Sequence, residues 1–217
     1  MSILDAILGR NFQRGRRVWS AKRARAVRLE DARIGDTVRI TGRALPADGL
    51  GRTPFTGVEA IVWRSSAEEK RLVSAEGRYG DRDETRQWVP QFEDQLRYPF
   101  FIVGDMGLRA LVDVRVALVA GDMADVTGAP AFQSADVHPA LDAYLRKNGY
   151  LPNGFMGIDG DHRFFEASLR PGDPVSVFAE LQERAAVASD GYRDAPQQTL
   201  HLAGSERRPP VLMLGTP

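Results

Sequence analysis

From Asp36 onward, short runs of alternating or continuously apolar residues are separated by turns rich in glycine, proline and aspartate. Residues 37–42 alternate polar and apolar side chains, as a strand with one buried face does. Two further pairs of runs, 99–103 with 108–112 and 163–169 with 175–181, flank short turns in the manner of β-hairpins. We therefore expect an α+β fold that is mostly a twisted antiparallel sheet or a partly open barrel.

The remaining segments complete a single expected domain, residues 31–217, with one or two helices. Apolar periodicity and turn residues define these elements. In chain order they are a strand at 58–65, a polar loop or solvent-exposed hairpin at 66–86 with a return strand at 85–89, a loop at 121–136, a helix from Pro139 that Gly149 ends, a polar segment at 183–198 and a last strand at 210–214.

The composition is that of a soluble globular protein and excludes several kinds of site. The 217 residues are 43% hydrophobic and 27% charged, and this length fits one domain. The sequence has no cysteine, which excludes disulfides, thiolate zinc sites, iron–sulfur clusters and cysteine nucleophiles. Only three of the 29 basic residues are lysines, a bias typical of GC-rich bacterial genomes. No apolar run approaches the roughly 18 residues that span a bilayer, so we expect a cytoplasmic protein, peripheral at the inner membrane if it binds lipid.

The first 30 residues carry an uneven share of the charge. Between Asp5 and Glu30 the sequence has eight basic residues and no acidic one. The whole chain has 29 basic and 29 acidic residues, so the remainder holds 21 basic residues against 29 acidic ones. Before these charges, apolar residues recur at helical spacing, namely Ile3, Leu4, Ile7, Leu8 and then Phe12. Residues 1–30 are therefore expected to form a basic arm, in which a short amphipathic helix precedes a basic tether.

Three interpretations of this arm remain open. In the first, its apolar face docks on the protein's own core and its arginines stay in water. In the second, it binds an anionic membrane surface. In the third, it binds nucleic acid, which a basic arm without an organised aromatic surface supports least. The residues that would contact a membrane are Phe12 and Trp19 as interfacial anchors, with Arg14, Arg16, Arg17, Lys22, Arg23 and Arg25.

Four segments, in the same order, resemble a known family. Residues 53–64 read TPFTGVEAIVWR and are similar to the S-P-x-T-G-x-P-C-x-W-Y-R segment of the GIDE-type, or "beside a membrane", domain. Trp88 falls where that family has a lone tryptophan. Residues 101–113 resemble its F-x-L-x-D-x-T-G-x-x-x-V-D hairpin, and residues 165–177 resemble its closing Y-x-E-x-x-L-x-P-G-D-x-V-x-V segment. The resemblance covers residues 35–181 and implies a β-rich domain that works next to a membrane.

The departures from the family limit what the resemblance implies. Its mitochondrial members are E3 ubiquitin ligases, whose activity depends on a RING finger with mostly cysteine zinc ligands. This chain has no cysteine, and His138, His162 and His201 are too scattered to replace them. Ligase activity is therefore not implied. The transmembrane helices typical of the family are also missing, and the basic arm takes the place of an N-terminal anchor, which favours the membrane-surface interpretation.

Two groups of residues are candidates for binding or chemistry. Trp63, Arg64 and Trp88 could form a cation–π or base-stacking platform, although core tryptophans beside a surface arginine are the commoner arrangement. In a strand, His162 and Glu166 share one face and could pair a base with an acid. Asp161 lies beside them in a polar turn without the spacing of a calcium loop. The sequence shows no recognisable catalytic motif, cofactor fingerprint or metal-ligand spacing.

We therefore expect a non-catalytic recognition or scaffold domain, acting on an unidentified protein partner at or near a bacterial membrane surface, without a metal or cofactor. A single-stranded nucleic-acid-binding module that uses Trp63, Arg64, Trp88 and the arm is the first alternative. An uncharacterised hydrolase built on His162 and Glu166 is the second.

Overall fold

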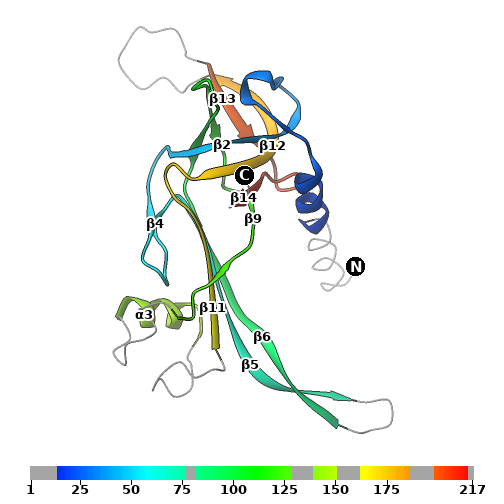
Figure 1. The fold of residues 1–217 in the computed structure, drawn as a ribbon, viewed down its shortest axis with the longest axis vertical. Helices are drawn as coiled ribbons and strands as arrows, with labels where there is room; N and C mark the ends of the chain where they lie inside the picture. The colour runs from blue at the N-terminus through cyan, green and yellow to red at the C-terminus, as the bar shows by residue number, and fades with distance from the viewer. Residues whose placement is uncertain (1–13, 77–81, 129–138, 151–161, 186–197, 215–217) are drawn as a thin grey trace. The chain divides into compact units, whose positions relative to one another are not determined.

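The computed structural model describes residues 14–76, 82–128, 139–150, 162–185 and 198–214. Strands dominate these ranges and helices are few, so the expected β-rich α+β fold is confirmed (Figure 1). The chain divides into two compact units. We call Met1–Leu50, Arg97–Asp122 and Leu169–Pro217 the barrel unit, and Gly51–Leu96 with Met123–Ser168 the hairpin unit.

The barrel unit contains one sheet of eight described strands in the order β1-β2-β7-β8-β13-β12-β14-β9. The strands are β1 (Ala26–Val27), β2 (Thr37–Pro46), β7 (Phe100–Val103), β8 (Arg109–Val112), β9 (Leu118–Ala120), β12 (Pro174–Ala185), β13 (Gln198–Ala203) and β14 (Val211–Leu214), and the 3₁₀ helix η1 (Leu29–Asp31) follows β1. A further pairing joins β12 to β2. As a result, β2, β7, β8, β13 and β12 close into a ring.

Long, shared strands make this closure possible. One half of β12, from Pro174 to Glu180, pairs with β2, and its second half, from Glu180 to Ala185, pairs with β13. All neighbours in the ring are antiparallel except β8 and β13, which are parallel. A small closed barrel without free edges satisfies the backbone hydrogen bonds of every strand in the ring. Five-stranded Greek-key barrels of this kind include the oligonucleotide-binding folds, but a fold alone assigns no function.

The interior of the barrel follows from the alternation that predicted the strands. Every second residue of β7 and β8 is fully buried, and on β2 Ile40 and Ala44 are fully buried. The buried apolar side chains of the ring include Ile40, Ala44, Phe100, Ile102, Ala110, Val112, Val177, Ala179, Leu181 and Leu202. Burying a side chain such as Leu, Ile or Phe stabilises a fold by roughly 1.5–3 kcal/mol, so this core is the main source of the unit's stability.

The first described residues of the basic arm form a helix, and β1 and the start of η1 follow within the arm. Residues 14–23 are helical, and the buried Ala21 packs against Phe178, Val211 and Met213, with Val18 beside it. The expectation of a basic tether after the first helix is therefore wrong for these residues, because a small apolar face on the tether itself fits the sheet. Docking on the protein's own core, the first interpretation of the arm, holds for this segment. The predicted amphipathic helix at its start, with Phe12, lies outside the described residues.

The hairpin unit contains a sheet of four described strands in the order β10-β11-β5-β6, and a separate pairing of β3 with β4. Its elements are β3 (Gly51–Arg52), β4 (Glu59–Ala60), β5 (Val62–Glu76), β6 (Arg82–Arg97), β10 (Ala124–Asp125), α3 (Pro139–Lys147) and β11 (His162–Leu169). One helical face of α3 packs on the sheet through Leu141 and Leu145. Aromatic rings fill the space between them at edge-to-face angles, including Phe55, Tyr144 and Phe164.

The strand predictions were accurate where alternation was strong. The hairpin of β7 and β8 forms as expected, and so does the helix α3, with Gly149 in a left-handed conformation (φ 71°) after its end. Strands β11 and β12 also form on either side of their turn, but the hairpin expected from them is wrong, because β11 pairs in the sheet of the hairpin unit and β12 pairs in the sheet of the barrel unit. The polar segment 66–86 belongs to the long hairpin of β5 and β6, which was one of two expected outcomes. The loop expected at 121–136 contains β10, and the polar segment expected before the last strand ends in β13. Both strands are stabilised by pairing with distant segments, which local periodicity does not report.

Candidate anion-binding site

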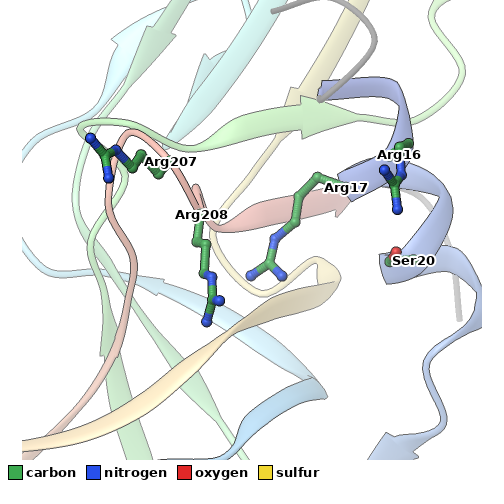
Figure 2. A pocket seen from close by; sticks show the side chains of 5 residues that line it. All are labelled: Arg16, Arg17, Ser20, Arg207 and Arg208. Atoms are coloured by element: carbon green, nitrogen blue, oxygen red, sulfur yellow. The ribbon is translucent and has the colours of Figure 1, made fainter.

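Arginines from two distant parts of the barrel unit line one pocket of about 560 Å³ (Figure 2). Arg16, Arg17 and Ser20 come from the helical segment 14–23, and Arg207 and Arg208 come from the turn before β14. The side chain of Arg17 extends from the helix toward Arg208, and Ser20 lies near Arg16 on the helix. Among the described residues, the pocket lining includes four cations and no acidic side chain.

Local structure fixes both sides of the pocket. Ser205 and Arg208 form a tight backbone bridge, in which each N–H donates to the other residue's carbonyl oxygen at 3.2 and 3.0 Å. The hydroxyl of Ser205 accepts a further hydrogen bond from the Arg208 N–H at 3.2 Å. Gly204 allows this turn, because a Cβ there would lie 2.8 Å from Cδ of Pro210. On the helix side, the docking of Ala21 holds the adjacent turns against the sheet.

Arg17 connects the two sides. Its Nε donates a hydrogen bond to the carbonyl oxygen of Pro209 at 3.2 Å, and its guanidinium lies 4.4 Å from the ring centroid of Phe178. Burial, and next the positive charge of Arg208, lower the pKa of Arg17 below its usual value. The group remains a cation at neutral pH, but in an environment that is short of negative charge. Such a site gains from an anion.

A second arginine of the same unit shows the same electrostatic pattern. Arg97 donates a hydrogen bond to the carbonyl oxygen of Ala117. Burial, with the charge of Arg14 as the second cause, lowers the pKa of Arg97 as well. The basic helix thus raises the electrostatic potential at more than one partly buried guanidinium group. Arginine offers a planar set of donors that matches phosphate and carboxylate oxygens, so binding of oxyanions is the chemistry that this arrangement can perform.

Most of the predicted membrane-contact residues lie on the same helix. Trp19 is 57% exposed, an unusual environment for an indole, and the Arg23 guanidinium lies 4.1 Å from its ring centroid. At about 100° per residue, Trp19, Arg23, Arg16 and Ser20 fall within an arc of about 100° of the helix, so the exposed indole and the pocket are neighbours. Three further exposed cations lie on the helix or directly after it, namely Arg14, Lys22 and Arg25.

The proposed platform of tryptophans is not assembled. Trp63 is only 7% exposed, and its ring packs edge-to-face on Tyr144 at 6.2 Å. Arg64 is the next residue of β5 and therefore points to the other face of the sheet, where it forms a two-pronged ion pair with Glu93 at 2.9 and 2.7 Å. The structure thus places these two residues in separate environments.

Trp88 is the exception within that group. It is half-buried on β6, and two cations lie over its ring, Arg163 at 4.0 Å and Lys70 at 5.7 Å from the centroid. Arg163 was not among the predicted site residues. Its position on β11, one residue from His162, gave no signal in the sequence, because β5 separates β11 from β6 in the sheet.

His162 and Glu166 do not form an acid–base pair. Both are buried on the inner face of β11, as their spacing predicted. Four residues of strand separate their backbones by about 13 Å, and Phe164 lies between them. His162 contacts the hydroxyl of Tyr150 through Nδ1. Asp161 lies outside the described residues, and no group of residues in the described ranges has the composition of a metal site.

Glu166 has a structural role. Its Oε1 accepts the N–H of Phe55 at 3.0 Å, and its Oε2 accepts the N–H of Thr56 at 3.2 Å and the Thr56 hydroxyl. Thr53 supports the same turn by accepting the N–H of Val58 at 3.0 Å. This carboxylate therefore holds the turn between β3 and β4.

Sequence reasoning missed Arg207 and Arg208. The consecutive arginines before Pro209 and Pro210 are a local basic cluster, but their importance depends on a contact between Arg17 and Pro209, 192 positions apart in the chain.

No family model, curated protein or solved structure matches this chain. In the part of the chain that the structure describes, no helix is long and apolar enough to cross a membrane.

Proposed function

We propose that this chain is a non-catalytic recognition or scaffold module that works at an anionic membrane surface in a bacterium. The observation that carries the proposal is the exposed Trp19, with Arg23 stacked on it, on a helix that is itself docked on the barrel. An indole in water loses favourable contacts, whereas the membrane interface accepts both its apolar ring and its N–H group.

The surrounding charge supports the same surface. Arg14, Arg16, Lys22, Arg23 and Arg25 are exposed on or next to the helix. Near an anionic leaflet, each basic residue contributes about 1 kcal/mol of attraction, and this contribution falls with added salt. Because Ala21 anchors the helix to the sheet, the module would meet the membrane in one defined orientation. The proposed location is therefore the cytoplasmic face of the inner membrane.

The protein partner would bind elsewhere. β6 stands at the end of its sheet, so among the described strands one of its edges is unpaired. An unpaired edge can accept a strand from another protein, although Pro90 removes one backbone donor. The resemblance of residues 35–181 to the "beside a membrane" domain supports a recognition role near lipid.

Vesicle co-sedimentation tests the proposal. The wild-type chain should bind vesicles of phosphatidylcholine with phosphatidylglycerol and should not bind phosphatidylcholine alone. Replacing Trp19 with Ala removes the apolar ring that the bound protein would bury in the membrane interface. This change should weaken vesicle binding roughly tenfold. Trp88→Ala is the matched control and should bind like the wild type. Equal binding by the Trp19→Ala variant, or equal binding to neutral vesicles, would contradict the proposal.

Single-stranded nucleic acid is the second candidate, and the environment of Trp88 favours it. An aromatic ring beside Arg163 and Lys70 is a surface on which a base could stack. Anisotropy of a fluorescent oligothymidine measures this directly. If this candidate is correct, Trp88→Ala weakens binding, Trp19→Ala does not, and affinity falls steeply with salt. Absence of binding at low salt excludes it.

A further inference from the structure

We propose that the pocket between the helical segment 14–23 and the turn 205–208 is a binding site for a phosphomonoester, a phosphate group with two ionisable oxygens. This inference deepens the proposed function, because it names the chemical group that the basic surface recognises. The pocket is a feature of the barrel unit alone and is distinct from the lipid contact proposed for Trp19.

The number and placement of the cations argue for a doubly charged ligand. Four guanidinium groups line a space of about 560 Å³, a volume typical of small-ligand sites. Two of them, Arg16 and Arg17, belong to the helix, and the other two, Arg207 and Arg208, belong to the turn. The side chain of Arg17 extends toward Arg208 (Figure 2). A phosphomonoester carries about 1.5 to 2 negative charges at pH 7 and three acceptor oxygens, so it can accept hydrogen bonds from several of these groups at once.

The electrostatics of the pocket lining support the same ligand. The described residues that line the pocket are four arginines and one serine. Arg17 is held in place by the carbonyl oxygen of Pro209 and the ring of Phe178, so it does not need to reorganise when a ligand arrives. A pre-oriented donor loses little conformational entropy on binding. The electrostatic cost of holding Arg17 near Arg208 is relieved when a dianion enters.

The chemistry distinguishes a monoester from a diester. A phosphodiester has one charge and two free oxygens, and it therefore satisfies fewer of the guanidinium donors. The hydroxyl of Ser20, also in the lining, adds a neutral donor that a third free oxygen can use. The phosphomonoester can belong to a lipid head group, such as that of phosphatidic acid, or to a soluble metabolite.

NMR titration of the full chain with methyl phosphate and with dimethyl phosphate tests the site. Methyl phosphate should bind at least about tenfold more tightly, since each charge-assisted hydrogen bond to an ion contributes on the order of 1.5–3 kcal/mol. The Arg207→Gln/Arg208→Gln variant should weaken methyl phosphate binding at least about tenfold. The matched control, Arg25→Gln/Arg28→Gln, removes the same charge from exposed positions outside the pocket and should bind as the wild type does. Arg208→Lys keeps the charge but loses the planar donors, and it should bind at an intermediate level.

Vesicles distinguish the two sources of the phosphate. A preference for phosphatidic acid over phosphatidylglycerol at equal surface charge, lost in the Arg207→Gln/Arg208→Gln variant, identifies a lipid head group. Tight binding of methyl phosphate without that preference identifies a soluble ligand. Equal affinity for the two methyl esters, no binding of methyl phosphate, or equal losses in the pocket and control variants would overturn the inference. Trp19→Ala should leave methyl phosphate binding unchanged, so failure of the membrane proposal is distinguishable from failure of this one.

Discussion

At the scale of single residues, Glu166 shows how far a strand pattern can be interpreted. Alternation along 162–169 correctly indicated that Glu166 faces inward with His162. It did not indicate what Glu166 faces, because its partners Phe55 and Thr56 lie 111 and 110 positions earlier in the chain. A carboxylate that is predicted to be buried suggests a catalytic role. In this structure the backbone N–H groups that Glu166 binds explain why it is buried.

This role predicts a large effect on stability. Replacing Glu166 with Ala leaves the N–H groups of Phe55 and Thr56 without their acceptor, and it should lower the free energy of unfolding by about 2–4 kcal/mol. Glu166→Gln keeps one acceptor oxygen and should cost less. Urea unfolding followed by circular dichroism measures both. The exposed Glu93 provides the control, since an open surface ion pair contributes about 0–1 kcal/mol. A loss from Glu166→Ala no larger than that from Glu93→Gln would show that the carboxylate does not hold the turn.

The tryptophans make the same point about residues. The three tryptophans have the same side chain but three different environments. Trp19 is exposed, Trp63 is buried, and Trp88 is half-buried between cations. Sequence neighbours could not distinguish them, because burial depends on which sheet face each position occupies.

At the scale of elements, local patterning accounts for most of the fold. β2, the β7–β8 hairpin, α3, β11 and β12 each carry their own alternation, helical spacing or turn residues, and each was predicted to within a few positions. β13 and β10 are short, and their strand character comes from partners that are distant in the chain. The sequence pattern predicts a tether where the helix 14–23 forms. The reason is that the apolar face of this helix consists of small residues such as Ala21, which contribute little to a hydrophobic pattern.

Two glycines, one in β2 and one in the helical segment 14–23, give element-scale predictions of opposite sign. A Cβ at Gly42 would lie 2.9 Å from Cγ1 of Ile102 and closer still to the carbonyl oxygen of Val103. Gly42→Ala should therefore destabilise the barrel, by roughly 1–3 kcal/mol. Gly15 lies in the helical segment with nothing within 4 Å of an added Cβ. Gly15→Ala should therefore stabilise the protein by about 0.5–1 kcal/mol.

Thermal unfolding of both variants measures these effects. Stabilisation by Gly42→Ala would contradict the close approach of β2 and β7, and a clear loss from Gly15→Ala would contradict the exposed helix.

At the scale of the whole molecule, the distribution of charge matters more than its sum. The chain has no net charge, but its first 30 residues are strongly basic and the rest is acidic. The candidate site could be half predicted from this pattern, since Arg16 and Arg17 belong to the basic segment. The other half, Arg207 and Arg208, is brought to the helix only by the closure of the sheet around β12 and β14. The account therefore depends on one surface, on which an exposed indole lies next to a pocket lined by arginines.

Quenching of tryptophan fluorescence by brominated lipid tests this surface most directly. Bromine on the acyl chains quenches only an indole that enters the membrane interface. With anionic brominated vesicles, the wild-type chain should lose part of its emission, and Trp19→Phe, which keeps Trp63 and Trp88, should lose almost none while still binding. The account is contradicted if the two proteins are quenched equally, or if bound wild-type protein is not quenched at all.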